Sequence, residues 1–82
     1  MDLKGRVAIV TGGAQGIGKS IAAQLALAGA NVVIADVAEE MAKSTAEEIS
    51  RKGSEAVSIV VDVSSLSSVE EMVKKTLDKF GR

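Results

Sequence analysis

The sequence predicts an α/β fold built on a parallel sheet, and two features of its hydrophobic pattern point to it. Three short runs of β-branched residues, at 7–10, 32–35 and 57–61, do not alternate with polar residues, which is typical of strands buried on both faces. Helical segments lie between and after these runs. Strict alternation of strand and helix implies parallel strands joined by right-handed crossovers. We therefore expect a βαβαβα unit with a three-stranded parallel sheet and helices on both of its faces.

Each helix has its own signals. The first is expected over residues 17–28, which are rich in Ala and Leu, and Gly29 supplies its stop. The second is expected over residues 38–51, where a few apolar residues stand among charged ones, and it stops near Gly53. The third has the clearest periodicity, because apolar residues recur at helical spacing from Leu66 to Phe80. Three serines qualify as its N-cap: Ser64, Ser67 and Ser68.

Composition limits the partners and the chemistry. The 82 residues suffice for one small domain, and a hydrophobic content of 46% excludes disorder. A net charge of −1 gives no reason to expect nucleic acid or a membrane surface as a partner. The chain lacks His, Cys, Tyr and Trp, so thiolate metal sites are excluded and acid–base chemistry would rest on Asp, Glu or Lys. We expect no metal site, and we expect the cysteine-free chain in the cytoplasm.

The glycine-rich stretch after the first run has two interpretations. Gly13, Gly18, Lys19 and Ser20 spell G-x-x-x-x-G-K-S, the phosphate loop of an ATP- or GTP-binding protein. The lysine would then reach the outer phosphates, the serine would bind magnesium, and Asp62 would help to hold the metal. A lysine at the start of an amphipathic helix is more often simply solvated, however, and an aspartate at the end of a strand is often a turn residue.

The second interpretation is a loop that binds a dinucleotide. Gly12, Gly16 and Gly18 would let the backbone turn sharply, approach a pyrophosphate and bring the helix close to the sheet. An acidic residue is then expected about 20 residues further on, at the end of the second strand, where it binds ribose hydroxyls. Asp36 stands at that place, whereas the phosphate-loop interpretation gives it no role. The dinucleotide interpretation explains more positions with one mechanism.

The spacing of this loop is not G-x-G-x-x-G but Thr11-Gly12-x-x-x-Gly16-x-Gly18. Together with the opening segment KGRVAIVTGGAQGIGKSIAAQLALAGANVVIADV and the later VDVSS and FGR, it resembles the N-terminal half of a short-chain dehydrogenase/reductase. That family consists of NAD(P)-dependent oxidoreductases with a Rossmann fold, and the resemblance covers essentially the whole chain. It implies that residues 1–82 are a partial Rossmann dinucleotide-binding domain, a half-Rossmann unit open to completion by dimerisation.

The resemblance implies cofactor-binding roles along the chain. Thr11 would stabilise the turn, the glycines would shape a pyrophosphate cradle, and Asp36 would accept hydrogen bonds from the adenosine ribose. Asp62 and Val63 would border the adenine, although Asp62 has the alternative of a strand-end turn. The full set is Thr11, Gly12, Gln15, Gly16, Ile17, Gly18, Asp36, Asp62 and Val63.

The resemblance also implies what is missing. The family's catalytic Ser, Tyr and Lys lie further along the chain, and no tyrosine is present, so we expect no catalytic residue and only weak binding of NAD through its adenosine half. The family's fourth strand is absent, which leaves residues 7–10 as an open edge. The expected partner is therefore a second copy of the chain, bound through this edge or by exchange of elements. A folding fragment without any ligand is the remaining alternative.

Overall fold

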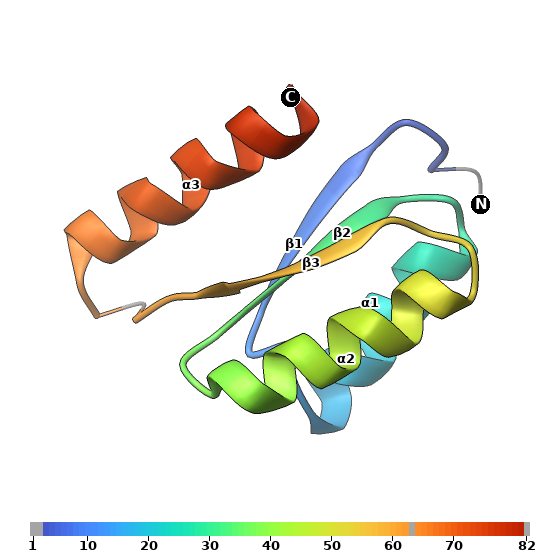
Figure 1. Ribbon diagram of the computed structural model, residues 1–82, viewed down its shortest axis with the longest axis horizontal. Coiled ribbons are helices and arrows are strands. Elements are labelled where there is room, and N and C mark those ends of the chain that lie inside the picture. The colour runs from blue at the N-terminus through green and yellow to red at the C-terminus, as the bar shows by residue number, and fades with distance from the viewer. Residues whose placement is uncertain (1–2, 63, 82) are drawn as a thin grey trace.

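The computed structural model describes residues 3–62 and 64–81 of the chain. Strands and helices alternate throughout (Figure 1). The elements are β1 (Val7–Thr11), α1 (Gly16–Leu27), β2 (Asn31–Asp36), α2 (Glu39–Arg51), β3 (Ala56–Val60) and α3 (Leu66–Phe80). The predicted βαβαβα order is confirmed, with only small shifts at the ends of the elements.

The strands form one parallel sheet in the order β1-β2-β3, so β2 lies in the middle. Val7 of β1 is in register with Asn31 of β2, and Val32 of β2 with Ala56 of β3. Helices α1 and α2 cover one face of the sheet, and α3 lies on the other (Figure 1). The predicted three-stranded parallel sheet with helices on both faces is confirmed.

The central strand β2 lacks polar alternation because both of its faces are covered. Val32 and Ile34 belong to the core under α1 and α2, whereas Val33 and Ala35 belong to the core under α3. None of these four side chains is accessible to solvent. A polar residue at any of the four positions would lose its contacts with water, so the strand can only be apolar.

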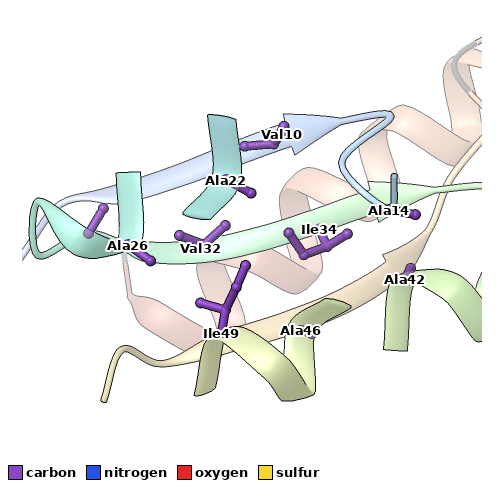
Figure 2. Packing of buried hydrophobic residues seen from close by; sticks show 10 residues of the cluster. Val10, Ala14, Ala22, Ala26, Val32, Ile34, Ala42, Ala46 and Ile49 are labelled. Carbon is purple, nitrogen blue, oxygen red and sulfur yellow. The ribbon is translucent and has the colours of Figure 1, made fainter. Parts of the chain in front are cut away.

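The larger core lies between the sheet and the pair α1 and α2 (Figure 2). Helix α1 contributes the small residues Ala22 and Ala26, which let its backbone approach the sheet closely. One member, Ala14, comes from the loop between β1 and α1 rather than from a regular element. The buried members are Val10, Ala14, Ala22, Ala26, Ala30, Val32, Ile34, Ala42, Ala46 and Ile49.

Helix α3 is capped by a serine other than those predicted. Its N-cap is Ser65, whose hydroxyl accepts a hydrogen bond from the amide of Ser68 at 3.4 Å. The prediction of Ser64, Ser67 or Ser68 was therefore wrong. Ser64 and Ser68 instead bond to Asp62 in the turn that precedes the helix, which fixes the entry of the chain and leaves Ser65 at the boundary.

One edge of β1 is open, as predicted. Among the residues that the structure describes, β1 pairs only with β2, and its five residues carry no charge. Ile9 in the middle of the strand is 38% exposed. Large apolar side chains also remain exposed on the helices of both layers: Ile17, Ile21, Val73 and Leu77.

Candidate functional site

The loops that follow β1, β2 and β3 meet at one edge of the sheet, because the strands are parallel. In open α/β sheets the ligand binds outside the carboxyl ends of the strands. The predicted site residues that the structure describes lie in these loops or beside them, so the fold brings the three parts of the predicted site to the same edge.

The loop between β1 and α1 depends on its glycines. Gly12 and Gly16 have φ angles of 69° and 62°, a region that favours glycine, and the amide of Gly12 donates to the carbonyl of Ala35 at 2.8 Å. Position 18 requires glycine for a different reason. A Cβ at Gly18 would overlap the carbonyl oxygen of Gly12, so only glycine lets the first turn of α1 lie against the loop. Thr11, the last residue of β1, holds the loop in register with β2.

The first turn of α1 contains no acidic residue of its own. The N-cap of α1, Gln15, makes no side-chain hydrogen bond to the helix. Helix α2, by contrast, has Glu39 and Glu40 in its first turn. Because a helix N-terminus carries unsatisfied amides and partial positive charge, α1 suits an anion, whereas α2 already has acidic residues there.

Space for such an anion is present beside the loop. A Cβ built at Gly12 or Gly16 would meet no heavy atom within 4 Å. The loop backbone is therefore open to close approach on this side, and Ile17 in the first turn of α1 is 81% exposed. The cradle is shaped by the absence of side chains, which is what a backbone that binds phosphate requires.

Asp36, the last residue of β2, faces this loop. One oxygen of its carboxylate accepts from the amide of Ala14 at 3.2 Å, and the other accepts from the amide of Ala38 at 3.1 Å. The side chain therefore connects the end of β2 to the glycine loop and to the start of α2. The glycine loop and Asp36, which the sequence predicts to form one site, are therefore in direct contact.

Two residues that hold this site were not identified from the sequence. Ala14 occupies a variable position of the glycine motif, yet it is only 3% exposed, and its carbonyl accepts a hydrogen bond from the Thr45 hydroxyl at 2.7 Å. The available signal was Thr45 itself, a polar residue between Ala42 and Ile49 on the apolar face of α2. A polar group on a buried face needs a hydrogen-bond partner.

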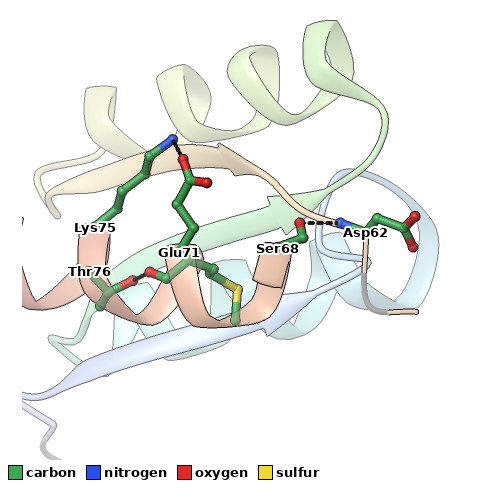
Figure 3. Close-up of polar contacts among 6 residues, drawn as sticks. Asp62, Ser68, Glu71, Lys75 and Thr76 are labelled. Atoms are coloured by element: carbon green, nitrogen blue, oxygen red, sulfur yellow. Dashed lines mark hydrogen bonds and ion pairs between the residues drawn. The ribbon is translucent and has the colours of Figure 1, made fainter. Parts of the chain in front are cut away.

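Asp62 lies after β3 and forms a tight turn. Its carboxylate accepts from the hydroxyl of Ser64 at 2.6 Å and from the amide of Ser64 at 3.0 Å. These two hydrogen bonds stabilise the charged form and lower the pKa of the Asp62 carboxyl. Its amide donates to the hydroxyl of Ser68 in α3 (Figure 3). Val63, the other residue predicted near the adenine, lies outside the described residues.

The geometry does not support the phosphate-loop interpretation. The ammonium group of Lys19 binds the carboxylate of Glu48 in α2 at 2.7 Å, and this contact lowers the pKa of Glu48. Lys19 therefore links two helices instead of facing the loop. Within residues 3–62 and 64–81, no cluster of three or more His, Cys, Asp or Glu residues could hold a metal ion. No helix in this part of the chain is long and apolar enough to cross a membrane.

Comparison with known proteins identifies the family. The model of the short chain dehydrogenase family matches residues 6–82. The chain belongs to the short-chain dehydrogenase family. Its members are oxidoreductases that in general depend on NAD(P), and the half-Rossmann unit with its glycine loop is the N-terminal region of their fold.

Individual relatives agree with this assignment. The chain is 42% identical to the (2S)-[(R)-hydroxy(phenyl)methyl]succinyl-CoA dehydrogenase subunit BbsD of Thauera aromatica, and 49% identical to the short chain dehydrogenase/reductase astE of Aspergillus oryzae. The alignments cover 100% and 99% of this chain but 33% and 31% of those proteins. The chain thus spans about a third of the length of the short-chain dehydrogenases that it matches.

Two solved structures superimpose closely on the chain. The crystal structure of gox2181 gives a TM-score of 0.94 at 44% identity, covering 99% of this chain and 32% of that one. A hydroxysteroid dehydrogenase from Escherichia coli gives a TM-score of 0.95 at 34% identity, covering 99% and 33%.

The contact between Gly18 and Gly12 can be tested by substitution. We expect Gly18→Ala to lower the free energy of unfolding by about 1–3 kcal/mol, the usual cost of overpacking, because the new methyl group overlaps backbone that cannot rotate away. Urea denaturation measures the loss, and amide chemical shifts of the loop report its displacement. Gln24→Ala, at an exposed position of the same helix, is the control. Normal stability and normal loop shifts in Gly18→Ala would contradict the steric argument.

Proposed function

We propose that this chain binds the adenosine and pyrophosphate half of NAD without catalysing a reaction. The observation that carries the proposal is the contact between the glycine loop and Asp36 at the carboxyl edge of the sheet. Through this contact, the free amides at the N-terminus of α1 lie near the carboxylate of Asp36. Such amides suit a pyrophosphate, and a carboxylate suits ribose hydroxyls. Membership of the short-chain dehydrogenase family and its general dependence on NAD(P) support the choice of ligand.

Different residues would contact different parts of the cofactor. Thr11 and the glycines keep the loop in shape, the amide of Ile17 and its neighbours face the phosphates, and Asp36 accepts from the ribose. Asp62 and Val63 border the adenine. The complete proposed set is Thr11, Gly12, Gln15, Gly16, Ile17, Gly18, Asp36, Asp62 and Val63.

Bound NAD supplies hydride-transfer chemistry, but this chain offers little to direct it. With no tyrosine among its 82 residues, the chain cannot form the Tyr-x-x-x-Lys pair that the family uses, and its only ionisable side chains are Asp, Glu, Lys and Arg. The proposed contacts reach only the adenosine and pyrophosphate, so affinity is expected to be weak.

Titration with NAD, ADP-ribose and ATP tests the proposal directly. Isothermal calorimetry, or amide chemical shifts at the loop and at Asp36, should show ADP-ribose binding nearly as well as NAD, because the nicotinamide half has no proposed contacts. Absence of binding by both ligands at millimolar concentration would reject the function and favour a folding fragment without ligand. Magnesium-dependent binding of ATP alone would favour the phosphate-loop interpretation instead.

We expect the chain to prefer NAD to NADP by about tenfold or more, which corresponds to 1.4 kcal/mol or more. The carboxylate of Asp36 can accept from ribose hydroxyls but repels a 2′-phosphate, and residues 37–42 contain no Lys or Arg to offset this repulsion. Competitive titration of the two cofactors measures the ratio. Asp36→Asn removes the charge but retains an acceptor oxygen, so the ratio should fall. Equal affinities in the unsubstituted chain would contradict the role of Asp36.

Lys19→Ala should leave dinucleotide affinity within about twofold of the original, an effect well below the tenfold that corresponds to 1.4 kcal/mol. Lys19 is engaged by Glu48 and is needed only in the phosphate-loop interpretation. Titration with ADP-ribose measures the affinity, and Glu48→Gln, which removes the same ion pair from the other side, is the matched control. Loss of nucleotide binding in Lys19→Ala but not in Glu48→Gln would give Lys19 a direct role.

We further propose that the chain by itself forms a homodimer through the open edge of β1. The strand presents unpaired backbone groups, carries no charge and exposes Ile9, so two copies can pair without bringing like charges together. A two-fold axis makes the pairing antiparallel and yields a six-stranded sheet in the order 3-2-1-1′-2′-3′. Exposed apolar side chains on both helical layers, such as Ile17 and Leu77, leave further surface to bury.

Ile9→Lys should weaken the dimer at least about tenfold, because it places two charges at the shared edge. Sedimentation over a range of micromolar concentrations measures the dissociation constant. Val60→Lys is the control, because Val60 is 51% exposed and lies on the opposite edge strand β3. A stable monomer before any substitution would reject the dimer, and dissociation by Val60→Lys alone would move the interface to β3.

A further inference from the structure

The peptide groups on both sides of Ala14 are fixed by side chains from other elements. Its carbonyl accepts from the hydroxyl of Thr45, which lies in α2, 31 positions away, at 2.7 Å. Its amide donates to the carboxylate of Asp36, 22 positions away, at 3.2 Å. The Ala14 methyl group is itself part of the core, near Ala42 and Ile34 (Figure 2). Ala14 therefore attaches the glycine loop to two other elements, in addition to the hydrogen bond from the Gly12 amide to the carbonyl of Ala35.

The hydrogen bond from Thr45 is buried, whereas the one to Asp36 is only partly buried. Thr45 is 2% exposed, and the hydrogen bond between its hydroxyl and the Ala14 carbonyl lies in the interior. Asp36 is only partly buried. Water competes weakly for a buried hydrogen bond, and loss of its donor leaves an unsatisfied carbonyl. Thr45 therefore provides the more durable of the two attachments.

A bound dinucleotide would affect the two attachments differently. If Asp36 accepts hydrogen bonds from ribose hydroxyls, as in the function proposed above, they share its oxygens with the amide of Ala14. The single hydroxyl proton of Thr45 is already donated to Ala14 from beneath the loop. The hydrogen bond from Thr45 can then keep the loop in position while the Asp36 carboxylate accepts hydrogen bonds from the ligand.

We propose that Thr45 is a positioning residue that holds the glycine loop in its binding conformation before the dinucleotide arrives. The expected effect of Thr45 on ligand affinity rests on the proposed function. Its effect on the order of the loop does not, because that effect concerns the chain without ligand. Pre-organisation of a binding loop raises affinity by removing the cost of ordering the loop on binding.

Thr45→Val is the decisive variant, because it keeps the shape of the side chain and removes the hydroxyl. We expect amide hydrogen exchange at residues 12–17 to become about tenfold faster without ligand, and ADP-ribose affinity to fall by up to about tenfold. Thr45→Ser restores the hydroxyl and should recover most of both effects. In the original chain, the Thr45 hydroxyl proton should itself exchange slowly and show contacts to Ala14 in NMR spectra.

Thr76 offers a matched control. It is 3% exposed, and its hydroxyl donates to the carbonyl of Met72 within its own helix α3 at 2.9 Å (Figure 3). Thr76→Val removes an equally buried hydroxyl without touching the loop, so it should change unfolding but neither loop exchange nor ligand affinity.

The outcomes separate the two proposals. Faster loop exchange in Thr45→Val, with no ligand binding even in the original chain, would support the role of Thr45 and reject the proposed function. Unchanged exchange in Thr45→Val would overturn the inference. So would equal effects of Thr45→Val and Thr76→Val on the loop, or global unfolding of Thr45→Val alone, since either result would make Thr45 a general stabilising residue.

Discussion

Burial of β2 between two layers of helices is the constraint on which the other elements depend. Four consecutive side chains of β2 are inaccessible, and they point alternately into the core under α1 and α2 and into the core under α3. Two right-handed crossovers, one into β2 and one out of it, place α1 and α2 on the same face of the sheet, and α3 covers the other face. This arrangement fixes the parallel order β1-β2-β3. With the strands parallel, their carboxyl ends share one edge, so Gly12 and Asp62, which follow β1 and β3, lie at the same edge as Asp36, the last residue of β2.

The loop above β1 is structured because part of it belongs to the core. Ala14 is buried among the side chains of β1, β2 and the two helices beneath, so a hydrophobic contact supports the turn that the glycines permit. Gly18 completes the arrangement, since the first turn of α1 lies against Gly12 without an intervening side chain. The open side of the loop is then free for a ligand. Packing on one side and access on the other are thus two consequences of the same small residues.

The sequence predicted the elements well, because each has a strong local signal: unbroken β-branched runs for the strands and helical spacing with a glycine stop for the helices. The spacing from the glycine loop to Asp36 was likewise visible, since both are fixed to strand ends. The cap of α3 was predicted wrongly, because several neighbouring serines can cap a helix and the hydrogen bonds of Asp62 decide among them. The contact of Ala14 with Thr45 could not be predicted, because it joins residues distant in sequence whose meeting depends on how α2 packs. Local chemistry determined what was predictable, and tertiary packing determined the rest.

Asp36 is both a specificity residue in the proposed function and a structural one in the molecule as it stands. Its carboxylate bonds to the amide of Ala14 in the glycine loop and to the amide of Ala38, the N-cap residue of α2, whose own methyl side chain cannot cap a helix. Replacement of Asp36 to accommodate a 2′-phosphate would therefore also loosen the loop and the start of α2. Asn offers one acceptor oxygen to these two amides, so it would retain only one of the two hydrogen bonds. Thr45, by contrast, holds the loop through a hydrogen bond in which Asp36 takes no part, so the proposed ligand would not compete for it.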